Sequence, residues 1–290
     1  CCCSLQRERG VNANGATGGI FELAWHGREK NSGRKKGYKT ILGGVHASVM
    51  AEEGLEHADF VVCGEGEDAL IKILDGKARE RIVRGDFIKD IDSLPKINRD
   101  LINVKYYQKS KDRNPGSHLH FVPSNTRLNS ILATRGCPFN CIFCHNSWRG
   151  LPTRMNSAKH VIEEMKELEG KYGTEAVFFM DDNFLANRKR VLEFCEGYRK
   201  ENLKIIWGCQ AMVTSVNEEI LKEIKSINCK QIMFGFESGN QRILSIVKNN
   251  ATTVEQNKKA IKFVKEAGIL ACGNFMIGNP TETEEEIMET

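Results

Sequence analysis

The sequence predicts an α/β protein organised around parallel β-sheet, and three observations lead to this fold class. From residue 129 onward, apolar strand-like segments alternate with amphipathic helical segments in strand–helix order. A shorter alternation of the same kind occupies residues 17–90. The chain has 290 residues, of which 40% are hydrophobic and 28% charged, values that are ordinary for a globular protein with two domains.

The first ninety residues predict a small α/β domain after an irregular start. Residues 1–16 show no periodicity, and we expect them to be disordered or non-native. We expect 17–90 to form a partial doubly wound domain and 91–126 a linker. Within that domain the pattern predicts a helix over 17–39, a strand at 40–42, a helix over about 49–56, a strand at 60–63 and a helix that carries Leu70–Leu74.

Five strand–helix units follow from residue 127 to residue 290. Strands are expected at 130–134, 176–180, 204–210, 231–236 and 269–277. Three helix starts carry N-cap signals, at Ser157, at Asn217 and at Thr252 or Thr253. This series predicts a parallel sheet with helices outside it, either barrel-like or open, and chemistry in such sheets gathers at the C-terminal ends of the strands.

Charge and chain ends restrict the class of protein. The net charge is +4, and Lys and Arg alternate with Glu along the helical segments, so nucleic acid is not expected as a partner. No apolar stretch reaches the length of a membrane span and no signal peptide is visible, which predicts a cytoplasmic protein. The chain lacks an initiating Met and stops within the first turns of an acidic helix, so we expect a fragment of a longer protein.

Three of the eleven cysteines have the spacing of metal ligands. Cys137, Cys141 and Cys144 form a C-x-x-x-C-x-x-C loop directly after the strand expected at 130–134. Structural zinc sites take four ligands, usually as two separated pairs, and this loop supplies three. A [4Fe-4S] cluster held by three thiolates would keep one iron open for another ligand. Five single cysteines stand in apolar segments and are expected to be buried small hydrophobes.

The cysteine loop, with Phe143 before its last cysteine, resembles the signature of the radical S-adenosylmethionine (SAM) superfamily. The resemblance spans roughly 127–290 and implies a partial (β/α)6 barrel, here ending after the fifth of six strands. It implies a [4Fe-4S] cluster on Cys137, Cys141 and Cys144, and SAM bound at the open iron. Reduction of the cluster then cleaves SAM to methionine and a 5′-deoxyadenosyl radical.

Polar residues at later strand ends match segments that contact SAM in this superfamily. Three groups are implied as contacts: Asp181, Asp182 and Asn183 for the SAM ammonium, Glu237 and Ser238 for its ribose, and Ile277 and Gly278 beside its adenine. Each group also has a plainer interpretation as a strand-to-helix turn with local caps. Within the last segment, Thr281 stands where the superfamily has a glycine.

The segment around Gly43, Gly44 and His46 is similar to the second half of a cobalamin-binding domain, which implies cobalamin as a further cofactor. A glycine pair at a strand end also allows close backbone approach to a bulky ligand, although it equally suits a tight turn. The cobalt-binding histidine of such domains lies in Asp-x-His-x-x-Gly, and none of the seven histidines has that context.

The leading hypothesis is an anaerobic radical SAM enzyme of the cobalamin-domain branch, which performs hydrogen abstraction or radical methyl transfer. It would act on a small-molecule substrate and receive electrons from a reductase or a flavodoxin- or ferredoxin-type donor. Two alternatives stay open. One is a radical SAM methylthiotransferase acting on tRNA or protein, and the other is a non-catalytic iron–sulfur or zinc-binding module.

Overall fold

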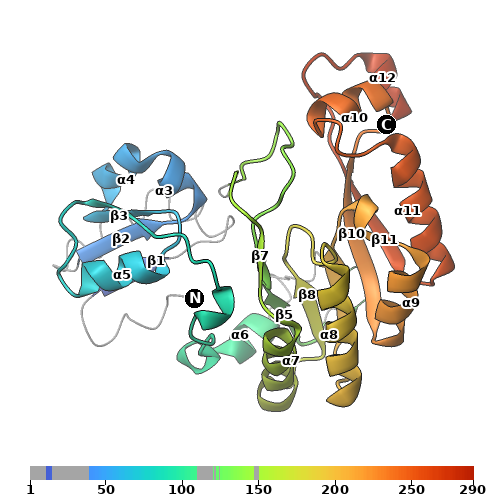
Figure 1. Cartoon of the computed structure of the whole chain (residues 1–290). Coiled ribbons are helices and arrows are strands. Elements are labelled where there is room, and N and C mark those ends of the chain that lie inside the picture. The colour runs from blue at the N-terminus through green and yellow to red at the C-terminus, as the bar shows by residue number, and fades with distance from the viewer. Residues whose placement is uncertain (1–10, 15–38, 110–119, 121, 124, 147–149) are drawn as a thin grey trace. The chain divides into compact units, whose positions relative to one another are not determined.

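The computed structural model describes residues 11–14, 39–109, 120, 122–123, 125–146 and 150–290 (Figure 1). The chain divides into two compact units. The first contains the described residues up to Lys89 together with Pro95–Asn103, and the second contains Asp90–Leu94 together with the described residues from Val104 to Thr290. The helix predicted over 17–39 lies outside the described residues, apart from Lys39, which begins a strand.

The first unit is a four-stranded parallel sheet in the order β1-β2-β3-β4. Adjacent residues of β3 face opposite sides of this sheet: Val61 packs with Ala47 under one layer of helices, and Val62 packs with Ile73 under the other. The elements are β1 Val11–Asn14, β2 Lys39–Gly43, α3 Val45–Val49, α4 Ala51–His57, β3 Phe60–Cys63, α5 Glu67–Leu74, β4 Ile82–Arg84 and η3 Arg99–Leu101.

One expectation for the N-terminal region is corrected, and one helix is added to those predicted. Residues 11–14, expected to be disordered or non-native, form β1 and pair in parallel with β2. A ladder needs only backbone groups, so this edge strand requires no apolar periodicity. The helix expected over about 49–56 is present as α4, but α3 before it was not predicted. Met50, at φ −114° and ψ 53°, leaves helical geometry and separates the two helices.

The second unit contains a five-stranded, all-parallel sheet in the order β11-β10-β9-β8-β5. The strands therefore lie beside one another in the order in which the chain makes them. The elements of this unit are η2 Ile91–Ser93, α6 Val104–Lys109, β5 Leu128–Ile131, β6 Thr134–Arg135, β7 Arg154–Met155, α7 Ala158–Tyr172, β8 Ala176–Phe179, α8 Arg188–Lys200, β9 Ile206–Gln210, η6 Val213–Ser215, α9 Glu218–Ser226, β10 Cys229–Glu237, α10 Gln241–Val247, α11 Val254–Glu266, β11 Leu270–Phe275 and α12 Glu284–Glu289.

Sequential order distinguishes the two arrangements that the sequence left open. A doubly wound sheet reverses its strand order at a switch point, whereas a barrel wall adds each strand beside the previous one. The large core lies between the sheet and α7, α8, α9 and α11. The opposite face carries a small cluster of four buried residues, Leu128, Ala176, Phe178 and Met233. This singly wound sheet corresponds to the predicted barrel wall.

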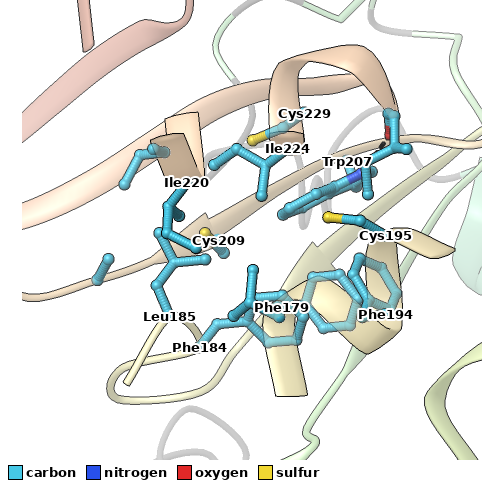
Figure 2. Close-up of a cluster of buried hydrophobic side chains, with 14 of the residues drawn as sticks. Phe179, Phe184, Leu185, Phe194, Cys195, Trp207, Cys209, Ile220, Ile224 and Cys229 are labelled. Atoms are coloured by element: carbon cyan, nitrogen blue, oxygen red, sulfur yellow. Dashed lines mark hydrogen bonds between the residues drawn. The ribbon is translucent and has the colours of Figure 1, made fainter. Parts of the chain in front are cut away.

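Trp207 of β9 is the centre of the large core (Figure 2). Its ring meets Phe179 and Phe194 edge to face, and its indole N–H donates to the Ile227 carbonyl at 2.7 Å. The predicted burial of single cysteines is confirmed within the described residues for Cys63, Cys195, Cys209 and Cys229, whereas Cys272 is half-buried. Burial raises the pKa of Cys195 to about 12, so this thiol keeps its proton.

The predicted helix starts are confirmed, and the structure decides between the two threonines. The side chains of Ser157 and Asn217 each accept an N–H from the first turn of their helix. Thr253 caps α11 in a reciprocal capping box with Gln256. Thr252 is buried, and its hydroxyl has no hydrogen-bond partner within the described residues.

Candidate functional site

The three cysteines lie on a loop that leaves the sheet at the C-terminal end of β5. The strand predicted at 130–134 is corrected: β5 ends at Ile131, and the chain turns into a separate two-stranded ribbon, β6 with β7. This antiparallel ribbon pairs Thr134 with Met155 and Arg135 with Arg154. The cysteine loop, defined here as residues 136–153, is therefore closed at its base.

Backbone contacts shape the cysteine loop and attach it to a second element. The Cys144 N–H donates to the Cys141 carbonyl at 3.3 Å, and the Asn146 side-chain amide donates to the Cys137 carbonyl at 2.7 Å. The Ile142 N–H donates to the Val247 carbonyl at 2.9 Å. The middle of the loop is thus held at the C-terminal end of α10, which follows β10.

The three thiols lie close enough for their charges to interact. Burial is the largest influence on the pKa of Cys137 and Cys141 and raises both, and the charge of Cys144 raises both further. Cys137 and Cys141 are half-buried, and Cys144 is exposed, as is Phe143. Among the described residues no group of three His, Cys, Asp or Glu side chains converges as a metal site. The donor set itself fits a soft metal centre, since three neighbouring thiols can exchange their protons for a metal.

The structure separates the three polar residues that follow β8. Asp182 is exposed, and its charge acts on Cys137, which places it beside the cysteine loop. Partial desolvation raises the pKa of the Asp182 carboxylate. Asp181 and Asn183, predicted as contacts alongside it, are buried instead. Of the three residues, only Asp182 is exposed, and it is the one beside the loop.

The two buried residues bind the chain itself. The Asp181 carboxylate accepts the Ala133 N–H at 3.1 and 3.3 Å. The Asn183 side chain accepts the Met212 N–H at 3.2 Å and donates to the Ser215 hydroxyl at 3.0 Å. These groups position the ends of β8 and β9, and their contact with a ligand stays a prediction.

Glu237, the last residue of β10, has an unusual backbone and a buried ionic partner. Its φ is +65°, a left-handed conformation that non-glycine residues seldom adopt. Its carboxylate lies 3.5 Å from the Lys248 ammonium, and both side chains are buried. A side chain on Gly235 would collide with the Glu237 carboxylate, so this glycine gives the ion pair its space. Burial raises the pKa of Glu237, and Lys248 opposes that rise.

Lys248 belongs to the site but was not predicted. It follows directly on Val247, which binds the cysteine loop, and its charge lowers the pKa of Cys141 against the effect of burial. The signal that could have identified it is a lone lysine at the end of the apolar helix Gln241–Val247. Neither composition nor periodicity predicts that such a lysine turns inward.

The hydroxyl of Ser238 forms hydrogen bonds within the protein. It pairs with the Thr290 hydroxyl at 3.0 Å and accepts the Asn240 N–H at 3.1 Å. Only 1% of the residue is exposed. The structure therefore places Ser238 at the predicted strand end but gives its hydroxyl two partners from the chain itself.

The predicted strand at 269–277 ends earlier, at Phe275, and the residues beyond it form an exposed turn. Ile277 is 68% exposed, and the Gly278 N–H donates to the Glu282 carboxylate at 2.7 Å. Thr281 has a φ of +67°, a left-handed conformation that non-glycine residues seldom adopt. Met276 donates its N–H to the Glu237 carbonyl at 2.8 Å, which brings this turn to the end of β10.

In the first unit, two glycine turns lie at the C-terminal ends of the neighbouring strands β2 and β3. Gly44 has a φ of +106° and Gly64 a φ of +80°, conformations that favour glycine. Ser48 connects the turns, since its hydroxyl donates to the Gly44 carbonyl at 2.8 Å and accepts the Gly64 N–H at 3.0 Å. His46 lies on α3 with its imidazole 3.5 Å from Glu53, and Gly43 ends β2 beside Val62.

Along the part of the chain that the structure describes, no helix is both long and apolar enough to cross a bilayer.

Comparison with known proteins identifies similar sequences over most of the chain. The family model of the radical SAM superfamily matches residues 131–290. An uncharacterized methyltransferase of Pyrococcus horikoshii is 30% identical over 86% of this chain and 56% of its own. The anaerobic magnesium-protoporphyrin IX monomethyl ester cyclase of Cereibacter sphaeroides is 31% identical over 86% of this chain and 43% of its own. The chain thus spans about half the length of the curated relatives it matches.

The fold also matches a solved structure. TsrM, a radical S-adenosylmethionine methyltransferase from Kitasatospora setae solved with cobalamin and a [4Fe-4S] cluster, superposes with a TM-score of 0.71. The match covers 96% of this chain and 59% of that protein at 18% sequence identity. At this identity the likeness establishes the fold.

Proposed function

The chain belongs to the radical SAM superfamily, and from that premise we propose that it is the cluster- and SAM-binding part of an enzyme of the methyltransferase or cyclase type. Cys137, Cys141 and Cys144 would hold the [4Fe-4S] cluster. When bound, the cluster and SAM supply a 5′-deoxyadenosyl radical. The substrate would be a small molecule, and a reductase or a flavodoxin- or ferredoxin-type protein would supply electrons.

One observation supports this proposal more than any other. The cysteine loop borders two further strand ends, since the charge of Asp182 acts on Cys137 and the charges of Lys248 and Glu237 act on Cys141. A simple electron carrier or zinc module needs only its metal ligands. It does not require charged side chains from other strand ends beside them. Polar groups that follow β8 and β10, beside a cysteine loop that follows β5, suit a site that also binds a polar cofactor next to the metal.

The residues around the thiols have distinct proposed tasks. Asp182, exposed and ionisable, would accept hydrogen bonds from the SAM ammonium group. Glu237 would face the ribose, with its direction set by Lys248 and by the space over Gly235. The exposed turn at Ile277 and Gly278 would border the adenine and shield it from water.

The first unit is proposed to bind cobalamin through Gly43, Gly44 and His46. The observation in favour is that Ser48 holds two glycine turns, at Gly44 and Gly64, together at one edge of a parallel sheet. Such an edge lets backbone approach a large planar ligand. His46 lies outside an Asp-x-His-x-x-Gly context, so it would contact the cofactor without ligating cobalt. Bound cobalamin should then show the spectrum of a form without a protein imidazole on cobalt.

The proposal is tested by anaerobic reconstitution with iron and sulfide. We expect about four irons per chain and conversion of SAM to 5′-deoxyadenosine in the presence of a reductant. Cys141→Ala should lose both, because two thiolates cannot hold the cluster. Cys272→Ala, a half-buried cysteine on β11, is the matched control and should keep both.

Full iron loading of Cys141→Ala would contradict the ligand assignment. Iron binding by the unmodified chain without any SAM binding would instead support an electron carrier.

A further inference from the structure

The ribbon of β6 and β7, which carries the cysteine loop, departs from the main body of the second unit at Ala133 and returns at Asn156. These two residues meet directly, since the Asn156 N–H donates to the Ala133 carbonyl at 2.8 Å. A shift of either residue would therefore also shift one end of the segment that carries the three cysteines.

Arg190, the third residue of α8, donates hydrogen bonds to both Ala133 and Asn156. Its Nε donates to the Asn156 carbonyl at 2.7 Å, and its Nη2 donates to the Ala133 carbonyl at 3.3 Å. Its Nη1 reaches the Phe184 carbonyl at 3.4 Å, and only 7% of the residue is exposed. The rigid fork of a guanidinium suits it to bridging several carbonyls at fixed spacing.

Asp181 binds the other backbone group of Ala133, its N–H. Its carboxylate accepts the Ala133 N–H and a hydrogen bond from the Thr134 side chain, and the residue has no exposed surface. The opposite charges of Asp181 and Arg190 attract each other across Ala133. Asp92 of η2 adds a third contact by accepting the Asn156 side-chain amide at 2.9 Å.

We infer that Asp181 and Arg190 are positioning residues that together clamp both ends of the ribbon that carries the cysteine loop, and thereby set the place of the loop relative to Asp182. This inference rests on the proposed function and adds a role that is distinct from ligand contact. A buried ion pair adds little net stability compared with apolar residues of similar size. Two buried charges aimed at the two ends of the ribbon that carries a functional loop are better explained by a requirement for fixed geometry.

Two conservative variants test the clamp. Asp181→Asn keeps one acceptor for the Ala133 N–H and removes the charge, and Arg190→Lys keeps the charge and removes the fork. Arg199→Lys is the matched control, because Arg199 lies on the same helix but pairs with Glu223 at the surface. Global unfolding in urea is measured for all three, so that a variant that merely fails to fold is recognised.

The first measurement is amide hydrogen exchange in the iron-free proteins. We expect exchange of the Asn156 amide to accelerate about tenfold in both clamp variants, as for the loss of one charge-assisted hydrogen bond. Amides of β9 should not change. Unchanged protection of the Asn156 amide in both variants would overturn the clamp, and so would equal acceleration throughout the sheet.

The second measurement is the change that SAM causes in the electron paramagnetic resonance spectrum of the reconstituted, reduced protein. The clamp variants should retain iron but require about tenfold more SAM for the half-maximal change, the same factor as in exchange. A normal SAM requirement in both would show that the clamp does not position the site. If the unmodified protein bound no iron, the proposed function would fail, while hydrogen exchange would still decide whether the clamp exists.

Discussion

At the residue scale, Asp181 and Asp182 show how neighbouring carboxylates acquire different tasks. The first is fully buried and binds the Ala133 N–H, and the second is exposed beside Cys137. The sequence presents two identical side chains after a strand, and both match a ligand-binding segment. The structure distinguishes them by environment: Asp181 binds the backbone of the protein, and Asp182 stays exposed beside the cysteine loop.

The buried carboxylate predicts a pH dependence of stability. Desolvation raises the pKa of Asp181 from 3.8 to about 6, despite hydrogen bonds and the charge of Arg190 that act to lower it. The folded state therefore binds this proton more tightly than the unfolded state does. The stabilisation from Asp181 is complete below pH 4 and is lost as the pH rises through 6.

The Asp181→Asn variant does not lose this stabilisation. Its free energy of unfolding should therefore rise relative to that of the unmodified protein as the pH rises from 4 to 7. We expect a change on the order of 2–3 kcal/mol in the difference between their free energies of unfolding, measured in urea. Asp92→Asn should show the opposite trend, and only below about pH 4, where the stabilisation from the ionised Asp92 is lost as the pH falls. Burial of Asp92 acts to raise its pKa, but hydrogen bonds from Ser157 and Asn156 hold it below the usual value. A difference that is independent of pH for Asp181→Asn would contradict this assignment.

The ion pair between Glu237 and Lys248 predicts a second effect of a single residue. Lys248→Met should lower the free energy of unfolding by about 3 kcal/mol, because it leaves a buried carboxylate without its cation. Adding Glu237→Gln should recover most of the loss, since the charge that needs compensation is then gone. Lys262→Met, which removes an exposed lysine 3.9 Å from Glu266, should change stability by less than about 0.5 kcal/mol. Equal losses in the single and double variants would argue against the pair.

At the element scale, the helices agree closely with the sequence because their start signals are local. An N-cap side chain needs only an N–H two or three residues ahead, so it can be identified without knowledge of the fold. The strand predicted at 130–134 was wrong in its second half for the opposite reason. Thr134 pairs with Met155 of β7, some twenty positions later in the chain. Ala133 forms hydrogen bonds with Asp181 and Arg190. No short sequence window contains those partners.

The capping box of α11 supplies a prediction at this scale. Thr253→Ala should lower the free energy of unfolding by about 1 kcal/mol, because it leaves the Gln256 N–H without its acceptor. Thr252→Val is the matched control. It replaces a buried hydroxyl for which the described residues offer no partner with a methyl group of similar size, so stability should be unchanged or improved. Thermal or urea unfolding measures both, and a larger loss for Thr252→Val would reverse the assignment of the cap.

At the scale of the whole molecule, the second unit is a barrel wall whose strands follow one another in chain order. Each strand therefore delivers its C-terminal end to the same edge as the previous one, and side chains separated by about a hundred residues can meet there. Cys141 and Lys248 are such a pair. A singly wound sheet thus creates the site from short segments that have no local relationship.

Binding at that edge should stabilise the molecule. The proposed cluster would bind the folded loop in preference to the unfolded chain, so anaerobic reconstitution should raise the temperature of thermal unfolding. SAM at a hundred times its dissociation constant should add about 2.7 kcal/mol more. Removing the iron with a chelator should reverse both shifts. Cys141→Ala should show neither, and a shift of normal size in that variant would place the metal elsewhere.

The sequence by itself determined the α/β class, the helix starts, the three cysteines and the superfamily, because these depend on local spacing and short-range hydrogen bonds. It also located the strand ends at which the polar residues lie. The tertiary structure alone decided that Asp182 and not Asp181 stays exposed beside the loop, that Lys248 turns inward to Glu237, and that Arg190 holds both ends of the ribbon that carries the cysteine loop. The physical reason is that burial and ion pairing depend on which distant segments meet at one edge of the sheet. The local sequence does not identify those segments.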